Sequence, residues 1–338
     1  MKSLAVGIIG VGSLGVKRAS ALAECRFGHL AAVADCDAAR SAAVAAEYGV
    51  PALSISELLA TPSIDAVLVC TPNASHADLS VAALQAGKHL LCEKPIGCQP
   101  TDAERIVAAV AETGRVFKMG SNHRYFRSVR AVRELIKSGS IGEILSMICR
   151  IGHNGERIQG SWYWAPEQAG GGALLDSGSH LVDLCRWFMG DFVACSGAAA
   201  QSFWKSAGVE DTASGILLTA AGRMAVLTTS RRLFSGYLHI EINGTNGFAW
   251  LDGRRDVFGV DRVTWSNSSN RNAPHVLDLS DDRANSMALE LDDFFDAIAA
   301  GRAISPSASD GLEVLRIITA IYAHPLTQLS SPGGTQPI

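Results

Sequence analysis

The sequence predicts an α/β chain in which a doubly wound parallel sheet is followed by an α+β domain with a large, mainly antiparallel open sheet. Three observations support this expectation. Apolar runs alternate with helical segments through residue 121, as in parallel strands joined by helices. The first apolar run ends in a glycine-rich turn, and beyond residue 122 apolar and polar residues alternate with a period of two, typical of strands with one wet face. We expect domains over residues 1–121 and 122–329.

Composition excludes several classes of protein. The net charge is −4 and the sequence has no basic run, which argues against nucleic acid or an anionic membrane as partner. No apolar run reaches the roughly 18 residues of a membrane span, and the start lacks a signal-peptide pattern. The eight cysteines show neither Cys-x-x-Cys pairs nor a Cys/His metal spacing, so we expect reduced thiols, no metal and a cytoplasmic location.

The first strand and its turn predict a dinucleotide site of the Rossmann type. Leu4–Ile9 is continuously apolar and runs into Gly-x-Gly-x-x-Gly at 10–15, followed by a helical segment over 16–25. Gly10 permits the tight turn, Gly12 lets the backbone approach a pyrophosphate, and Gly15 lets helix and strand pack closely. The helix N-terminus favours the anion. The residues expected to bind the cofactor here are Gly10, Gly12, Ser13 and Leu14.

An acid follows the second strand. Residues 30–34 are apolar and end at Asp35, which comes 20 positions after Gly15. A carboxylate there accepts hydrogen bonds from the adenosine ribose and repels a 2′-phosphate, so NAD is favoured over NADP. Arg40 is a nearby cation on the predicted helix Ala38–Tyr48. The plain interpretation of Arg40 is a surface position on that helix. NAD is therefore preferred, but NADP is not excluded.

Polar residues follow the third strand, residues 65–70. Because ligands gather at the carboxyl ends of parallel strands, we expect Thr71, Pro72 and Asn73 to contact the dinucleotide. His76 begins the next helix. A cofactor contact and a structural role explain it equally well.

Glu93-Lys94-Pro95 closes the fourth strand, residues 89–92. Pro95 restrains the backbone from which Lys94 can aim its ammonium at a ligand. An ordinary surface ion pair between Glu93 and Lys94 is the alternative. A further strand over 116–120 completes what we expect to be a six-stranded sheet.

The sequence pattern changes after residue 121. A polar-aromatic cluster at 122–126 precedes a helix over 128–138 and a strand over 144–151. The irregular stretch 152–172 is rich in Gly, Trp and Tyr, and so long a loop is more often functional than idle. Its aromatics can stack on a ligand ring or pack over the domain junction.

Residues 170–188 contain a second candidate site. Apolar residues recur at helical spacing from residue 181, so a helix with one core face begins there. Asp176 lies four positions before His180 and could orient its imidazole. The alternative is a helix cap and a core histidine. The apolar residues are Leu181, Leu184, Cys185 and Phe188.

The remaining segments predict an antiparallel sheet and two helices. We expect strands near 193–201, 213–219 and 223–230, and a hairpin turn at 243–247. Helices are expected over Ser286–Ala300 and 310–323, the last packing back on the first domain. The tail 330–338 is expected to be mobile.

Five ordered motifs resemble the Gfo/Idh/MocA family of oxidoreductases, which includes glucose–fructose oxidoreductase and inositol dehydrogenase. The resemblance covers nearly the whole chain. It implies that Lys94 and His180 lie at the nicotinamide with Asp176 beside them, that Asp183 is a partner of His180, and that Glu93 and Asn122 contact the cofactor. It also makes Arg124 and Trp162 candidates to bind substrate. The motifs are residues 10–15, 71–73 with His76, 93–95, Asn122 with Arg124 and Phe126, and 170–183.

The implied chemistry is oxidation of a secondary alcohol of a cyclic polyol, sugar or sugar derivative. A base must remove the hydroxyl proton while a hydride leaves carbon. His180 is the better base by the ordinary pKa of histidine, and Lys94 can hold the substrate oxygen or relay the proton. The order of these proton transfers is left open.

Two other functions are compatible with the sequence. In one, the enzyme keeps NAD(P) tightly bound and recycles it, as in sugar oxidoreduction, epimerisation or glycoside cleavage. In the other, the protein senses nucleotide without turnover. The resemblance also implies a homodimer or homotetramer formed through the open sheet.

Overall fold

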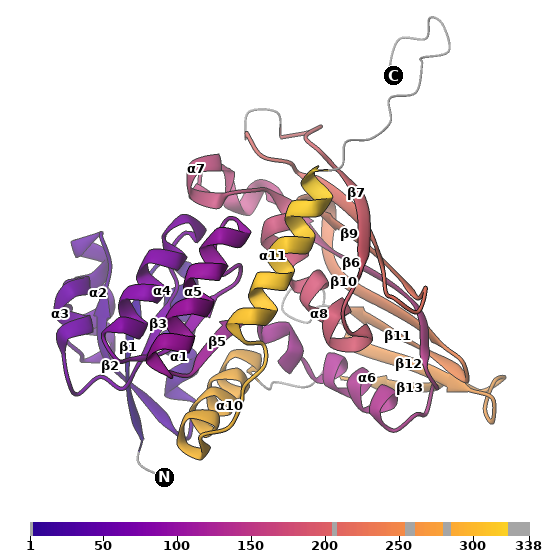
Figure 1. The fold of residues 1–338 in the computed structure, drawn as a ribbon, viewed down its shortest axis with the longest axis horizontal. Coiled ribbons are helices and arrows are strands. Elements are labelled where there is room, and N and C mark those ends of the chain that lie inside the picture. Colours follow the sequence, from indigo (N-terminus) through magenta and orange to yellow (C-terminus); the bar gives the residue numbers. More distant parts are fainter. Residues whose placement is uncertain (1–2, 205–207, 254–260, 280–284, 324–338) are drawn as a thin grey trace, which may run out of the picture.

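Two sheets organise the chain. The computed structural model describes residues 3–204, 208–253, 261–279 and 285–323, so the predicted tail 330–338 lies outside the described residues. A five-stranded parallel sheet comes from the first half, and an eight-stranded, mainly antiparallel sheet comes from the second (Figure 1). The predicted fold class is confirmed.

The first sheet has the strand order β2-β1-β3-β4-β5, all parallel. Its central strands are almost wholly apolar and buried on both faces, because helices cover both sides. The strands are β1 (Leu4–Ile9), β2 (Gly28–Ala34), β3 (Ala66–Val69), β4 (His89–Glu93) and β5 (Phe117–Gly120). The helices are α1 (Ser13–Ala23), α2 (Ala38–Tyr48), α3 (Ile55–Ala60), α4 (His76–Gln85) and α5 (Pro100–Thr113).

The expectation of six strands was wrong: the described residues form five. Next to β2, Ala52 makes a single parallel bridge to Val33. Pro51 precedes it and accepts a hydrogen bond from the Val33 amide but has no N–H to donate to a ladder. The edge position beside β2 is therefore reduced to one bridge.

The second sheet has the order β13-β12-β11-β10-β6-β9-β8-β7, antiparallel except for the β6–β9 pair. The strands predicted near 193–201, 213–219 and 223–230 and the hairpin turn at 243–247 are confirmed. The strands are β6 (Ile144–Asn154), β7 (Ala194–Ala200), β8 (Thr212–Leu218), β9 (Met224–Ser230), β10 (Arg232–Gly244), β11 (Gly247–Gly253), β12 (Asp261–Asn267) and β13 (His275–Asp278).

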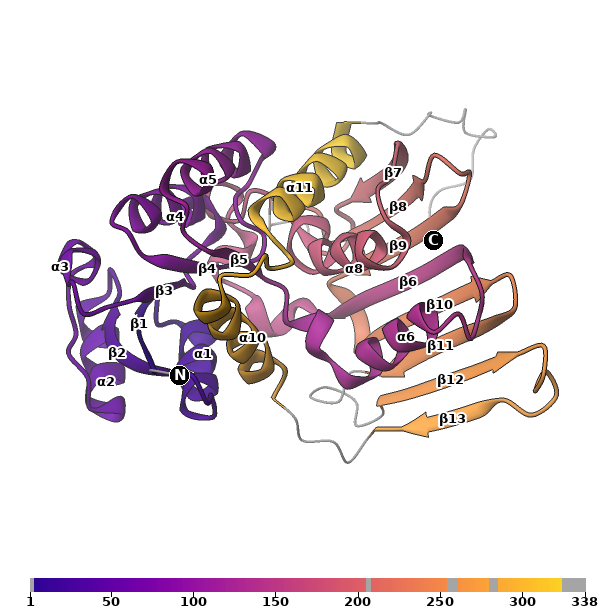
Figure 2. The ribbon, with the colours of Figure 1, turned by 60° about the horizontal axis from the view of Figure 1, so that its bottom comes forward.

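Helices cover one face of this sheet. α6 (Arg127–Lys137) contacts β11 and β12, and α8 (Ser179–Met189) contacts β6 and β9; Figure 2 shows both helices beside the strands. Between β6 and α8 the predicted irregular stretch contains short helical turns at Gly155–Ile158 and Trp162–Trp164 and the short helix α7 (Pro166–Ala169).

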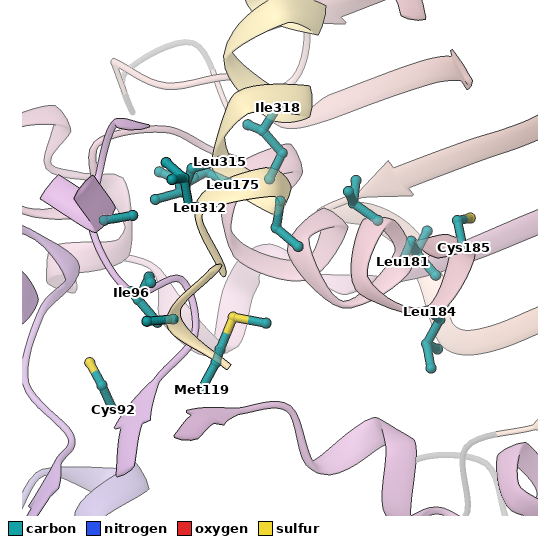
Figure 3. Close-up of a cluster of buried hydrophobic side chains, with 14 of the residues drawn as sticks. Cys92, Ile96, Met119, Leu175, Leu181, Leu184, Cys185, Leu312, Leu315 and Ile318 are labelled. Atoms are coloured by element: carbon teal, nitrogen blue, oxygen red, sulfur yellow. The ribbon is translucent and has the colours of Figure 1, made fainter. Parts of the chain in front are cut away.

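The two C-terminal helices return to the first sheet. α11 (Ala308–Ala323) packs on α5 and β5, as predicted, and also on α8 and β7. Its apolar side chains belong to one core that includes residues of both sheets, part of which is shown in Figure 3. The α10 helix (Ser286–Ala300) packs on α1, and its residues Phe294 and Phe295 share a core with β1 and β2. The domain bounds 1–121 and 122–329 stay a prediction.

Removing the ring of Phe295 tests the docking of α10. This side chain is fully buried, and its ring occupies the space where a Cβ on Gly28 would stand, 2.4 Å from Cε2. We expect Phe295→Ala to lower the free energy of unfolding by about 3–5 kcal/mol, through lost burial and a cavity. Chemical denaturation measures this. Phe203→Ala, at a ring that is 66% exposed, is the control, and equal losses in the two variants would contradict the docking.

Candidate active site

A cavity of about 700 Å³ opens at the carboxyl ends of β4 and β5, between the two sheets. The N-terminus of α1, the end of β6 and the turn before α8 also contribute to its wall. Ligand cavities in α/β folds occur at this edge of the sheet. The site residues predicted from sequence that line it are Ser13, Leu14, Glu93, Lys94, Asn122, Trp162, Asp176 and His180.

The glycine turn has the shape that a dinucleotide requires. Gly10 has φ of +88°, and a Cβ there would lie 2.7 Å from a methyl carbon of Thr71. A Cβ on Gly15 would lie 2.0 Å from the carbonyl oxygen of Gly10, whereas one on Gly12 would meet no atom within 4 Å. Gly12 is also the N-cap of α1, and no side chain caps the helix. The open backbone at a helix N-terminus therefore fits the pyrophosphate of a dinucleotide.

Asp35 braces this turn. Its carboxylate accepts hydrogen bonds from the amides of Val11, at 2.8 Å, and Asp37, at 2.9 Å. Burial opposes the ionised form, but these bonds and Arg40 lower the pKa of Asp35 below its ordinary value. Arg40 is an exposed residue of α2, as its plain interpretation has it, and it pairs with Asp35 at 3.4 Å and Asp37 at 3.2 Å. A ribose contact of Asp35 stays a prediction.

The polar residues after β3 hold the backbone. The Asn73 amide donates to the Ala169 carbonyl at 2.8 Å, and the Thr71 hydroxyl accepts from Ser75. The buried ring of His76 lies between the carbonyl oxygens of Pro95, at 2.7 Å, and Thr71, at 2.8 Å.

None of the four residues Thr71, Pro72, Asn73 and His76 lines the cavity. For His76 these contacts favour the structural alternative. Cofactor contacts by the other three stay predictions.

Lys94 is held by an acid from the second half of the chain. Its Nζ donates to Oδ1 of Asp176 at 2.9 Å and to the Asp176 carbonyl at 3.1 Å. A π-helical turn at Leu174–Gly178 places Asp176 there, so it is not the helix cap of the alternative interpretation. Arg231 pairs with Oδ2 of Asp176 at 3.3 Å. The carboxylate thus lies between two cations.

Arg231 was not predicted from the sequence as a site residue. Its side chain is buried, donates to the Tyr163 carbonyl at 2.9 Å and lies over the ring of Trp164 at 4.6 Å. Burial alone would raise the pKa of Asp176, but Lys94 and Arg231 outweigh it and hold that pKa well below its ordinary value. An arginine directly after the apolar strand β9 is the signal that could have pointed to it.

His180 lies in the first turn of α8 and is buried at the cavity wall. Its ring stacks on that of His123, with centroids 3.6 Å apart and planes 9° apart. His123 also lines the cavity. Among the residues predicted as a polar-aromatic cluster, it was not singled out.

Arg124 is not among the residues that line this cavity, and a contact with substrate stays a prediction. Its Nε and Nη2 donate to the two oxygens of Asp183 at 2.8 and 2.6 Å, and its Nη1 donates to Ser305. The Ser121 hydroxyl also donates to Asp183. A two-point ion pair of this kind is strong and fixes the guanidinium against Asp183. Asp183, expected as a partner of His180, has Arg124 as its main partner.

Glu93 and Asn122 are both anchored at the cavity wall. Glu93 is buried and accepts from Nε of Arg18 at 2.5 Å. The Asn122 amide donates to the hydroxyl of Ser286, the first residue of α10, at 3.0 Å. Their contacts to a cofactor stay predictions.

Comparison with known proteins identifies the family. Residues 4–121 match the family described as "Oxidoreductase family, NAD-binding Rossmann fold", and residues 129–249 match "GFO/IDH/MocA C-terminal domain". The chain belongs to the Gfo/Idh/MocA family of oxidoreductases. The resemblance read from the motifs is confirmed, and the first domain is an NAD-binding Rossmann domain.

Relatives in this family share nearly the full length. Inositol 2-dehydrogenase of Rhizobium meliloti is 32% identical over 93% of this chain and 94% of its own length. The 1,5-anhydro-D-fructose reductase of Ensifer adhaerens is 32% identical, over 90% and 91%. A structure of levoglucosan dehydrogenase in complex with NADH superposes with a TM-score of 0.87 at 25% identity, covering 95% of this chain and 96% of that one.

Two other classes of feature do not occur in the described part of the chain. It contains no group of three or more His, Cys, Asp or Glu side chains able to hold a metal ion. None of its helices combines the length and apolar character needed to cross a membrane.

Asp176→Asn tests the charge arrangement around Lys94. The variant leaves Lys94 and Arg231 without their shared carboxylate, so we expect a loss of about 3–5 kcal/mol in the free energy of unfolding at pH 7. The folded-state pKa of Asp176 lies below its unfolded value. Its stabilisation is therefore complete above the unfolded pKa and disappears as the pH falls through the folded one. The gap to wild type should narrow from about pH 5 towards pH 2.

Urea denaturation across this pH range measures the gap. The matched control is Asp78→Asn, which breaks a surface pair with Arg105 whose side chains are both more than half exposed, and it should cost at most about 1 kcal/mol. A pH-independent gap for Asp176→Asn, or one no larger than the control, would contradict the assigned charges.

Proposed function

We propose that this oxidoreductase is an NAD-dependent dehydrogenase acting on a secondary alcohol of a cyclic polyol, sugar or sugar derivative. One observation carries the proposal: the Lys94 ammonium, fixed by Asp176, shares a cavity with His180 and the start of the cofactor helix. A fixed cation beside a histidine suits removal of a hydroxyl proton with stabilisation of the oxygen left behind.

The roles follow from the chemistry of the side chains. NAD⁺, when bound, supplies the acceptor for the hydride. Lys94 donates a hydrogen bond to the substrate oxygen and stabilises its developing negative charge. His180 accepts the hydroxyl proton, directly or through Lys94. Asp176 keeps the ammonium in place, and Arg231 keeps Asp176 in place.

Aromatic side chains in the cavity wall support a ring-shaped substrate. Trp162 and Tyr163 stack on each other at 3.9 Å and both line the cavity. Flat aromatic faces pack well against the C–H faces of a cyclic polyol. His153 and Asn154 at the end of β6 line the same cavity and provide polar groups for hydroxyls.

A substrate panel tests the activity. Purified protein is mixed with NAD⁺ or NADP⁺ and a set of inositols, sugars and anhydrosugars, and free reduced cofactor is followed by absorbance. We expect turnover with at least one cyclic substrate and faster turnover with NAD⁺. Conversion of substrate without free NADH would point to a recycled cofactor. Binding of NADH without conversion of any substrate would point to a nucleotide sensor and contradict the proposal.

Alanine variants test the two side chains at the reacting oxygen. We expect Lys94→Ala and His180→Ala each to lower kcat by about 10²-fold or more, because each removes a group that acts on the proton or the oxygen. NADH affinity, measured by fluorescence titration, should change little. Lys137→Ala, an exposed residue of α6, is the control and should behave as wild type. Near-normal kcat in both variants would refute these roles.

The uncovered face of the second sheet supports self-association. A row of side chains crosses it at directly paired positions, from Ile216 through Val226, Ile148 and Glu241 to Trp250. Ile216, Ile148 and Trp250 are each more than 40% exposed. Large apolar surfaces of this kind mark interfaces, and we propose that the face pairs with a second copy in a homodimer or homotetramer.

A charge at the centre of this face tests the assembly. We expect Ile148→Asp to shift the protein to a monomer, since two copies would bury opposing carboxylates. Sedimentation equilibrium measures the mass. Ala46→Asp, on exposed α2 in the first domain, is the control. A monomeric wild type, or an unchanged assembly in Ile148→Asp, would contradict this interface.

We also propose a cytoplasmic location. All eight cysteines are unpaired thiols, and Cys149 and Cys185 remain unbridged although their sulfur atoms lie 3.5 Å apart in the core. Reduced thiols are the rule in that compartment.

A further inference from the structure

A buried arginine links the cofactor helix to the catalytic lysine. Arg18 lies in α1, one turn beyond Leu14 at the cavity wall, and its side chain is completely buried. Burying a guanidinium is costly unless anions pair with it. Its Nε lies 2.5 Å from Oε1 of Glu93, and its Nη2 lies 2.8 Å from Oε2 of Glu290.

The two carboxylates come from elements that meet under the cavity. Glu93 ends β4, directly before Lys94, and lines the cavity. Glu290 is fully buried on α10 and accepts the amide hydrogen of Ser121, just after β5, at 2.7 Å. One guanidinium therefore connects α1, the ends of β4 and β5, and α10.

The end of β5 leaves room for this pair. A Cβ on Gly120 would lie 3.0 Å from Nη2 of Arg18 and 3.1 Å from Oε2 of Glu93. Both contacts are tighter than side chains normally make, so the missing side chain at 120 is part of the arrangement. Few other residues could occupy that position without moving Arg18 or Glu93.

Arg18 also decides which carboxylate Lys94 meets. Glu93, its neighbour in the chain, and Asp176 are the two carboxylates that line the cavity together with Lys94. Because Glu93 is engaged by Arg18, the ammonium is left to Asp176. Without Arg18, Glu93 would be a buried carboxylate without its cation, and Lys94, the next residue and a lining residue of the same cavity, could supply one.

We propose that Arg18 is a positioning residue for the reaction: by engaging Glu93 it directs Lys94 to Asp176 and fixes the cofactor helix against the catalytic edge of the sheet. This inference rests on the proposed function for the role of Lys94. Arg18 does not line the cavity, and because it is fully buried it cannot contact a ligand there.

The charged surroundings define what a variant should do. The groups facing Arg18 are Glu93 from β4, Glu290 from α10 and the Cys70 thiol after β3. The charged or titratable groups that line the cavity with Lys94 are Lys17, Glu93, His123, His153, Arg157, Tyr163, Asp176 and His180, and Arg231 pairs with Asp176.

The variant Arg18→Met keeps an unbranched apolar side chain at this position but removes the positive charge. Glu93 then lacks the charge of Arg18, and the added negative charge at the cavity wall favours the protonated form of the base. We expect the acid limb of the kcat/KM profile to move to higher pH. We also expect kcat to fall by about tenfold or more through misplacement of Lys94, and NADH to bind several-fold more weakly. Arg18→Lys restores the charge and should return the acid limb most of the way to wild type.

The matched control is Lys88→Met, at the opposite end of β4. Lys88 is buried, and its Nζ donates to the carbonyls of Thr61 and Ile64 at 2.6 and 2.9 Å. Its loss should destabilise the same domain without touching the cavity. Urea denaturation, NADH titration by fluorescence and pH–rate profiles are measured on all variants.

The proposal is overturned if Arg18→Met keeps the wild-type pH profile and NADH affinity, or if Lys88→Met shows the same shifts. If Arg18→Met does not fold, Gly120→Ala pushes a methyl group against the same pair and must still shift the profile. An unchanged profile there also overturns it. A wild type that binds NADH without turning over any substrate would refute the proposed function, whereas the effect of Arg18 on NADH affinity would still be measurable.

Discussion

The ion pair between Lys94 and Asp176 is the contact on which the site depends. It joins residues 82 positions apart and spans the two halves of the chain at the cavity between the sheets. Burial disfavours both charges, and a second cation, Arg231, offsets this for the carboxylate. Regular backbone positions both residues of the pair: Asp176 lies in a π-helical turn, and Lys94 directly follows a buried strand. A site built on rigid elements holds its groups in one arrangement.

The packing of the C-terminal helices fixes the position of the two sheets relative to each other, and so the positions of Lys94 and Asp176. α11 contributes to a core shared by both sheets, and α10 closes the first sheet against α1. Polar contacts link the same elements: Glu290 of α10 pairs with Arg18, and Ser286 of α10 accepts a hydrogen bond from Asn122. The chain therefore crosses between the halves several times, and the cavity has walls from both.

Local patterns account for what could be predicted. The glycine turn, the strand ends and the helix at 181–188 are encoded by neighbouring residues, so their positions followed from spacing. Arg231 and His123 could not be found this way, because their roles arise from contacts between distant segments. The ion pair of Arg124 with Asp183 was missed for the same reason, since the two residues lie far apart in the sequence.

Chemical rescue tests the central claim most directly. Lys94→Ala removes the ammonium and leaves space beside Asp176, into which a small primary amine such as methylamine can bind. The account predicts that the rate of Lys94→Ala rises with methylamine concentration to a plateau, and that His180→Ala does not respond. No response of Lys94→Ala to the amine, or an equal response of His180→Ala, would contradict the assignment of Lys94 to the reacting oxygen.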